Sequence, residues 1–260
     1  MIVECPTPDR TADPTGRSTM SSALPGASNY HDYVYESLRP YLGRRVWEIG
    51  SGCGQYTDRL LADGRAVLAS DIDPDSVRAL RERAATDDHL SAAFVDLYDR
   101  RSLHRCLEWA PDSILCLNVI EHIATDRDSL LAIAEKAPEG TVAVFLAPAF
   151  RMLYGFMDAQ AGHYRRYTRA TLGGAFAAAG WDVRRTFYLN PVGGVGWFVQ
   201  NRLLARRTSD LDSPAVNGNI EFFDRYCVPA TRLLDRVTSR FFGQSVVCVA
   251  RAPAGSGRRS

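Results

Sequence analysis

Three glycines and an acidic residue stand where an apolar run of the sequence ends. Residues 46–54 read VWEIGSGCG, with Glu48 ahead of Gly50, Gly52 and Gly54. Glycine lets a backbone turn sharply and lets a ligand approach with no Cβ in the way. Because many turns between a strand and a helix contain glycines, this run alone indicates only a ligand that resembles a nucleotide.

Two further carboxylates follow in step, since Asp71 and Asp96 end the next two apolar runs. There, one carboxylate can accept hydrogen bonds from both ribose hydroxyls of a nucleoside, and the other can meet an adenine amino group. A dinucleotide site would have glycine at position 55, which is Gln55, and Glu48 would repel a pyrophosphate. S-adenosylmethionine carries an ammonium and a sulfonium, so the acidic setting favours this cofactor over NAD.

Two of the five histidines, His122 and His163, follow the fourth and fifth apolar runs. The carboxyl ends of parallel strands meet at one edge of an open α/β sheet, so both imidazoles are expected at that edge. Histidine is the commonest general base and a frequent metal ligand. A lone histidine is more often a structural hydrogen-bonding group, but the shared edge makes His163, His122 and the neighbouring Tyr164 the catalytic candidates.

Apolar periodicity predicts the elements that position these side chains. Strands are expected at 45–49, 66–71, 92–96, 113–118, 141–147, 181–188 and 245–250, and helices at 29–42, 55–63, 75–86, 101–109, 126–136 and 169–179. This alternation indicates an α/β fold with a seven-stranded, doubly wound, mostly parallel sheet, an N-terminal helix and a helical insertion before the last strand. The glycines of residues 193–196 (GGVG) are expected to form a flexible or closely packed turn.

Residues 41–180 resemble the class I S-adenosylmethionine-dependent methyltransferases, including their motif after the fourth strand, which reads NVIEHI at 118–123 in this chain. By this resemblance the methionine, ribose and adenine parts of the cofactor lie along successive strand ends. The implied cofactor-binding residues are Glu48, Gly50, Ser51, Gly52, Gly54, Tyr56, Asp71, Ile72, Asp96, Leu97, Asn118 and Val119.

The same motif resembles two metal-using families, the ubiquinone-biosynthesis O-methyltransferases and the small-RNA terminal 2′-O-methyltransferases. Both have Glu-x-x-Glu-His at this position, and the second has a later histidine that would fall near His163. This chain has Asn118 in place of the first glutamate, and a neutral amide weakens a site for a hard cation. We therefore expect no metal, with Glu121 capping the next helix or bonding nearby backbone. The candidate ligands for a metal are Glu121, His122 and His163.

Residues 147–168 resemble a branch of bacterial methyltransferases with a GHYRRYT run, many of which act in glycan or specialised-metabolite pathways. Expected acceptor contacts are Tyr154, Asp158, Arg166 and, beyond this run, Trp197; arginine forks suit a carboxylate or phosphate. The expected reaction is methyl transfer to a hydroxyl oxygen of a small-molecule acceptor. The alternatives are C- or N-methylation, an NAD-linked epimerase or reductase, and a non-catalytic scaffold that binds the cofactor.

The domain boundaries follow from composition. We expect flexible tails at 1–28 and 254–260 and a methyltransferase domain at 29–253, with 189–244 as a helical lid. The aromatic residues of this lid are consistent with an acceptor pocket, a dimer interface or a membrane-surface patch, so the chain is expected to be a monomer or a homodimer. A net charge of +1 gives no field for nucleic acid. The absence of CxxC pairs, of an apolar signal core and of a transmembrane segment favours the cytoplasm.

Overall fold

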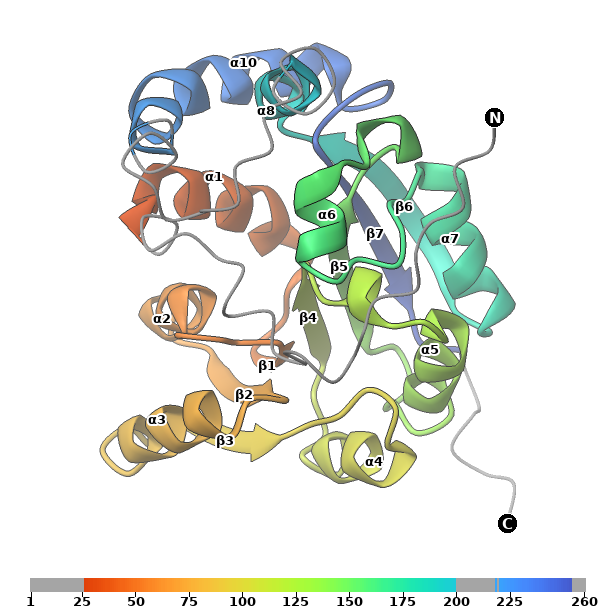
Figure 1. Cartoon of the computed structure of the whole chain (residues 1–260). Coiled ribbons are helices and arrows are strands. Elements are labelled where there is room, and N and C mark those ends of the chain that lie inside the picture. The colour runs from red at the N-terminus through yellow and green to blue at the C-terminus, as the bar shows by residue number, and fades with distance from the viewer. Residues whose placement is uncertain (1–25, 200–217, 219, 254–260) are drawn as a thin grey trace.

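The computed structural model describes residues 26–199, 218 and 220–253 of the 260-residue chain. Its centre is one seven-stranded sheet with the strand order β3-β2-β1-β4-β5-β7-β6 (Figure 1). The strands are β1 (Arg45–Ile49), β2 (Ala66–Asp71), β3 (Leu90–Phe94), β4 (Ser113–Leu117), β5 (Val142–Pro148), β6 (Asp182–Leu189) and β7 (Ser245–Arg251). The predicted mostly parallel, doubly wound sheet is confirmed.

Strand direction creates the ligand-binding edge. Strands β1 to β5 pair in parallel, while β7 is antiparallel to both β5 and β6. The chain first winds outward from β1 through β2 to β3 and then crosses to β4 on the other side of β1. Ligands of open α/β sheets bind at the carboxyl ends of the strands where the winding reverses. Here that point is the loop that leaves β1.

Helices cover both faces because successive strand residues point to opposite sides. On one face, Val46 packs in a cluster with α1 (Ser28–Leu38), α2 (Gln55–Ala62), α3 (Pro74–Ala84) and α10 (Val228–Thr238). On the other, Trp47 packs in a cluster with α4 (Arg100–Glu108), α5 (Asp126–Ala134) and α7 (Arg169–Ala178). The sheet is therefore buried on both sides, as its near-continuous apolar strands require.

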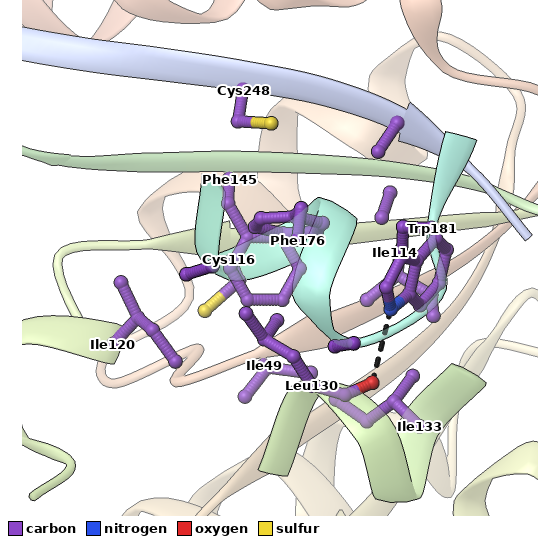
Figure 2. Packing of buried hydrophobic residues seen from close by; sticks show 14 of the residues in the cluster. Ile49, Ile114, Cys116, Ile120, Leu130, Ile133, Phe145, Phe176, Trp181 and Cys248 are labelled. Carbon is purple, nitrogen blue, oxygen red and sulfur yellow. Dashed lines mark hydrogen bonds between the residues drawn. The ribbon is translucent and has the colours of Figure 1, made fainter. Parts of the chain in front are cut away.

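Large aromatic side chains fill the second of these clusters. The rings of Phe145 and Phe176 meet edge to face with their centroids 5.0 Å apart. Trp181 lies beside them, and its indole nitrogen donates a hydrogen bond of 3.0 Å to the carbonyl oxygen of Leu130 (Figure 2). This bond satisfies the one polar atom of a buried ring and ties the residue before β6 to α5.

Two local predictions are wrong. Strand β3 begins and ends two residues before the predicted 92–96. The GGVG run is not a flexible turn but part of α8 (Pro191–Phe198), because the Asn190 side chain accepts a hydrogen bond of 2.9 Å from Gly193 N and Pro191 supplies the first helical residue. The run is closely packed, since a Cβ on Gly194 would lie 2.9 Å from the ring of Phe242.

The terminal and inserted segments are described only in part. Ser28 already belongs to α1, while the tails predicted before Gly26 and after 253 lie outside the described residues, as does 200–217 of the insertion. The described part of the insertion comprises α8, the π-helical turn η7 (Phe223–Cys227) and α10. Within the described ranges, no helix combines the length and the apolar character that crossing a bilayer requires.

Candidate active site

The loop after β1 has the backbone that the glycines predicted. Gly50, Gly52 and Gly54 have φ values of +75°, +51° and +88°, a region that other residues rarely adopt. A Cβ on Gly50 would overlap the side chain of Val119, so this glycine also lets the loop after β4 approach. Ser51 is buried, and its hydroxyl accepts a hydrogen bond of 3.1 Å from Ser70 N, which fixes the loop to β2.

Glu48 lies beneath this loop and is 3% exposed. Thr57, at the start of α2, donates a hydrogen bond from its hydroxyl to the Glu48 carboxylate. Burial raises the pKa of Glu48 to about 7, despite the lowering effect of this bond. A buried carboxylate near neutrality is a suitable partner for the ammonium group of a cofactor. Thr57 was missed in the sequence analysis, although its position in the first turn of the helix after the glycines was a usable signal.

Replacing Glu48 with glutamine is expected to remove part of the pH dependence of stability. Because the pKa of Glu48 is about 7 in the folded chain against an ordinary 4.5, its stabilising contribution is complete below about pH 4.5 and is lost as the pH rises through 7. The free energy of unfolding of the wild type, relative to Glu48→Gln, should fall by on the order of 3 kcal/mol between pH 4.5 and pH 8. Urea unfolding without cofactor measures this difference.

The matched control for this measurement is Glu82→Gln, which changes an exposed glutamate of α3. Its stability relative to the wild type should stay constant over the same pH range. A Glu48→Gln variant that follows the wild type at every pH would contradict the assignment.

Asp71 ends β2 and turns toward the glycine loop. Its carboxylate accepts hydrogen bonds of 2.8 Å from Gly52 N and 2.9 Å from Asp73 N. Asp96 lies two residues beyond the end of β3, half-buried, and accepts a bond of 2.9 Å from Tyr98 N. The structure thus places both carboxylates at the same sheet edge as the glycine loop.

The remaining predicted cofactor residues surround the same loop. Leu97 is buried, whereas Ile72, Tyr56 and Val119 are half-buried. Asn118 is exposed directly after β4, with a φ of +53°. These residues fit S-adenosylmethionine by the chemistry of their groups. The acids suit its ammonium and ribose, the apolar side chains suit its adenine, and a Cβ at Gly52 would meet no atom within 4 Å, so the loop leaves room there. The roles of individual residues stay predictions.

The two candidate histidines come together. His122 lies in η4 (Ile120–His122), and its ring meets the ring of His163 edge to face with centroids 4.7 Å apart. His163 reaches this point because the backbone amide of Tyr164 donates a 2.9 Å hydrogen bond to the carbonyl oxygen of Glu121. Burial lowers the pKa of His122 to about 4, and the neighbouring His163 adds to this effect. The imidazole of His122 is therefore neutral near pH 7.

Asp158 holds His163 in this position. It lies in a short helix that was not predicted, α6 (Phe156–Gln160), and one carboxylate oxygen is 2.8 Å from both His163 Nδ1 and Arg166 Nε. The other oxygen accepts a 2.9 Å bond from Gly155 N. Asp158 is 1% exposed, and the Arg166 side chain 2%. The charged groups of Asp158 and Arg166 are thus buried against each other, and their contact with the acceptor stays a prediction.

Glu121 is the least expected member of the cluster. Its carboxylate is fully buried, and neither oxygen has a hydrogen-bond partner among the described residues. Burial raises its pKa to about 7, while the nearby His163 lowers it. The predicted helix-capping role is wrong, because α5 has no side-chain cap at its start. Instead, Glu121 Oε1 lies 4.0 Å from His163 Nε2.

Glu121, His122 and His163 could together hold a cation. Each offers one ligand atom, and the three atoms lie within 4.8 Å of one another. Asp158, on the far nitrogen of His163, occupies the place of the carboxylate that commonly orients a metal-bound histidine. The donor set of two imidazoles and a carboxylate fits a cation such as Zn²⁺.

The other expected acceptor contacts lie around this cluster. Tyr154 is half-buried, and its hydroxyl donates a hydrogen bond of 2.8 Å to the carbonyl oxygen of His163. The Trp197 indole of α8 donates a 3.0 Å bond to the carbonyl oxygen of Leu153, and the Arg166 guanidinium lies 5.1 Å from the Trp197 ring centre. Their contact with an acceptor, like that of half-buried Tyr164, stays a prediction.

Comparison with known proteins agrees with this geometry. Residues 47–140 match the methyltransferase domain family. The ubiquinone biosynthesis O-methyltransferase of Schizosaccharomyces pombe is 25% identical over 113 residues, 41% of this chain and 39% of that protein. The glycine/sarcosine N-methyltransferase of Parasynechococcus marenigrum is 30% identical over 106 residues, 40% of this chain and 36% of that protein. The chain thus spans about two fifths of the length of these curated relatives.

A solved structure extends the likeness over most of the fold. The phosphoethanolamine N-methyltransferase 2 of Haemonchus contortus, in complex with S-adenosyl-L-methionine, superimposes with a TM-score of 0.56 at 13% identity, covering 91% of this chain and 58% of that chain. At such low identity this likeness concerns the fold. Residues 47–140 thus match a methyltransferase domain in sequence, and the chain has the fold of S-adenosylmethionine-dependent methyltransferases.

Proposed function

We propose that this chain transfers a methyl group from S-adenosylmethionine to a hydroxyl oxygen of a small-molecule acceptor, in specialised-metabolite or glycan biosynthesis. The observation that carries the proposal is the Asp158–His163 pair at the carboxyl edge of the sheet, with Nε2 of His163 turned toward Glu121. Hydroxyl oxygen is a poor nucleophile until its proton is removed, whereas a neutral amine attacks with a lone pair that is already free. An oriented imidazole therefore favours oxygen as the acceptor atom.

The Asp158 carboxylate sets the tautomer of His163. Burial alone would raise the pKa of Asp158, but the hydrogen bonds with His163 and Arg166 hold it below its ordinary value. An ionised carboxylate accepts the proton of His163 Nδ1, which leaves the lone pair on Nε2. This nitrogen takes the hydroxyl proton as the acceptor oxygen attacks the methyl carbon. The carbon–sulfur bond breaks, and its electrons stay on the sulfur of the cofactor.

Glu121 and His122 complete the proposed base. The buried Glu121 carboxylate, 4.0 Å from His163 Nε2, stabilises the imidazolium that forms. His122 stays neutral and supplies a wall of the site. Asp158, Arg166 and Glu121 are positioning residues for His163, and Tyr154, Tyr164 and Trp197 are proposed to contact the acceptor.

Label transfer tests the choice of acceptor atom. The full chain is incubated with S-adenosylmethionine labelled in its methyl group and a mixture of hydroxylated, aminated and carbon-acid small molecules. We expect the label in methyl ethers or esters. Label found only on nitrogen or carbon would overturn the O-methyl proposal, and cofactor binding with no transfer to any acceptor would favour the non-catalytic scaffold.

A divalent cation in the Glu121, His122 and His163 cluster is a second candidate, and one observation favours it. Both Glu121 oxygens are buried with no hydrogen-bond partner among the described residues, an arrangement that costs free energy unless a proton or a cation is bound. A cation there would bind the acceptor oxygen and lower the pKa of its hydroxyl. The sequence predicts no metal here, so binding of a metal by this cluster has to be measured directly.

Calorimetric titration of the metal-free chain with Zn²⁺ decides between the two candidates. A metal site predicts one bound ion, with Asp158→Asn weakening its binding by about 10- to 100-fold, the usual effect of losing such a carboxylate. Glu121→Gln should weaken it at least as much. Retained binding of S-adenosylhomocysteine shows that each variant is folded. No zinc binding, together with activity that survives EDTA, would remove the metal candidate.

A further inference from the structure

The outer surface of the last helical segment is apolar. Phe222 and Tyr226 are 59% and 58% exposed, and Leu233, Val237 and Phe241 are 64%, 71% and 76% exposed. Their spacing of three or four residues, with Pro229 and Ala230 between, places them along one side of the η7–α10 helix and the turn that follows it. We call this row of exposed residues the outer stripe. Figure 1 shows α10 at the periphery of the molecule, beside α1 and α8.

The acids of this segment mostly face inward. The Asp224 carboxylate is buried and accepts hydrogen bonds from Tyr30 N at 2.7 Å and from Asn29 Nδ2 at 3.0 Å. Asp235 accepts a hydrogen bond from the Tyr33 hydroxyl of α1. The exposed acid of the described segment is Glu221, at its beginning. The acidic side chains therefore lie mainly on the face that packs on α1, and the outward face carries few of them.

A row of arginines runs beside the outer stripe. Arg225, Arg232, Arg236 and Arg240 are all exposed, and each follows a position of the stripe by three residues. Arg232 is paired with Glu36 of α1. Arg240 also lines a cavity of about 510 Å³, together with Arg169, Arg184 and Arg185. No carboxylate from the described part of the chain lines this cavity. Asp182, just outside this lining, pairs with Arg184.

We propose that the outer stripe and its arginine row bind an anionic membrane surface, with α10 lying in the plane of the interface. A helix with an exposed apolar side flanked by arginines inserts its apolar side chains among lipid tails while its cations meet the phosphates. Charge decides against a second copy of the chain as the occupant. Two such surfaces brought face to face would place like-charged arginine rows together, whereas an anionic surface neutralises them.

Vesicle co-sedimentation of the full chain tests this proposal. We expect binding to vesicles of equal parts phosphatidylcholine and phosphatidylglycerol, weak binding to phosphatidylcholine alone, and release at high salt. The triple variant Arg225→Gln, Arg236→Gln, Arg240→Gln should weaken binding about a hundredfold, since each arginine near an anionic surface contributes about 1 kcal/mol. The variant Leu233→Ser, Val237→Ser, Phe241→Ser should weaken it at least about tenfold.

A matched control removes the same charge elsewhere. Arg81, Arg101 and Arg127 are exposed on α3, α4 and α5, and their joint change to glutamine should leave vesicle binding within about twofold of wild type. All variants should bind S-adenosylhomocysteine as the wild type does, which shows that they are folded. Equal binding by the arginine variant and the control, or no vesicle binding by the wild type, would overturn the proposal. So would a dimer that the serine variant dissociates in the absence of lipid.

Discussion

Replacing Asp71 with alanine is expected to weaken the binding of S-adenosylhomocysteine at least about a hundredfold. A hydrogen bond to a charged group contributes about 1.5–3 kcal/mol, and the carboxylate at the end of β2 is proposed to accept two from the ribose hydroxyls. Asp71 also holds Gly52 N at 2.8 Å, so its loss loosens the glycine loop. Isothermal titration calorimetry of the metal-free chain measures the affinity.

Two further variants separate binding from folding. Asp71→Asn keeps the shape of the side chain and one acceptor oxygen, so it should weaken binding less than Asp71→Ala. Asp88→Ala removes an exposed acid before β3 and should leave the affinity unchanged. Thermal melting shows whether each variant is folded. A folded Asp71→Ala variant that binds S-adenosylhomocysteine as tightly as the wild type would exclude the ribose-binding role.

Replacing His163 with alanine is expected to lower turnover by about 10²- to 10⁴-fold while the affinity for S-adenosylhomocysteine stays within about twofold. This range is the usual contribution of a general base. His163 is the best-oriented base of the cluster because it lies beside His122 and contacts Asp158 at 2.8 Å. Turnover is followed as S-adenosylhomocysteine release with an acceptor found by label transfer.

The positioning role of Asp158 has its own readout. Asp158→Asn removes the carboxylate that orients His163, so turnover should fall and the shape of the pH–rate profile should change. His89→Ala, at an exposed position before β3, is the matched control and should change neither quantity. Turnover that is unchanged in His163→Ala would reject the base, and an unchanged profile in Asp158→Asn would leave Asp158 a purely structural residue.

The framework of the fold could be predicted because it depends on local patterns. Strands β1 and β2 have the predicted bounds, since each is a short apolar run that ends at a glycine-rich loop or an acid, a pattern typical of a strand. The helix α7 begins at Arg169 as predicted, and the hydroxyl of Thr168 before it accepts a hydrogen bond from Thr171 N.

The failures concern features that tertiary contacts decide. The GGVG run reads as a turn because glycine disfavours helices, yet the cap from Asn190 and the close approach of Phe242 make a helix there. Sequence could not tell which arginine of the GHYRRYT run is buried, and the structure shows that it is Arg166, which pairs with Asp158. The unpartnered state of Glu121 depends on what packs around it, and no local pattern records that.

We infer that the sheet edge built from Glu48, Asp71 and the glycine loop binds S-adenosylmethionine. Titration calorimetry of the wild-type chain tests this inference, with S-adenosylhomocysteine and NAD titrated separately. We expect micromolar binding of S-adenosylhomocysteine and no detectable heat from NAD. Binding of NAD with none of S-adenosylhomocysteine would contradict it.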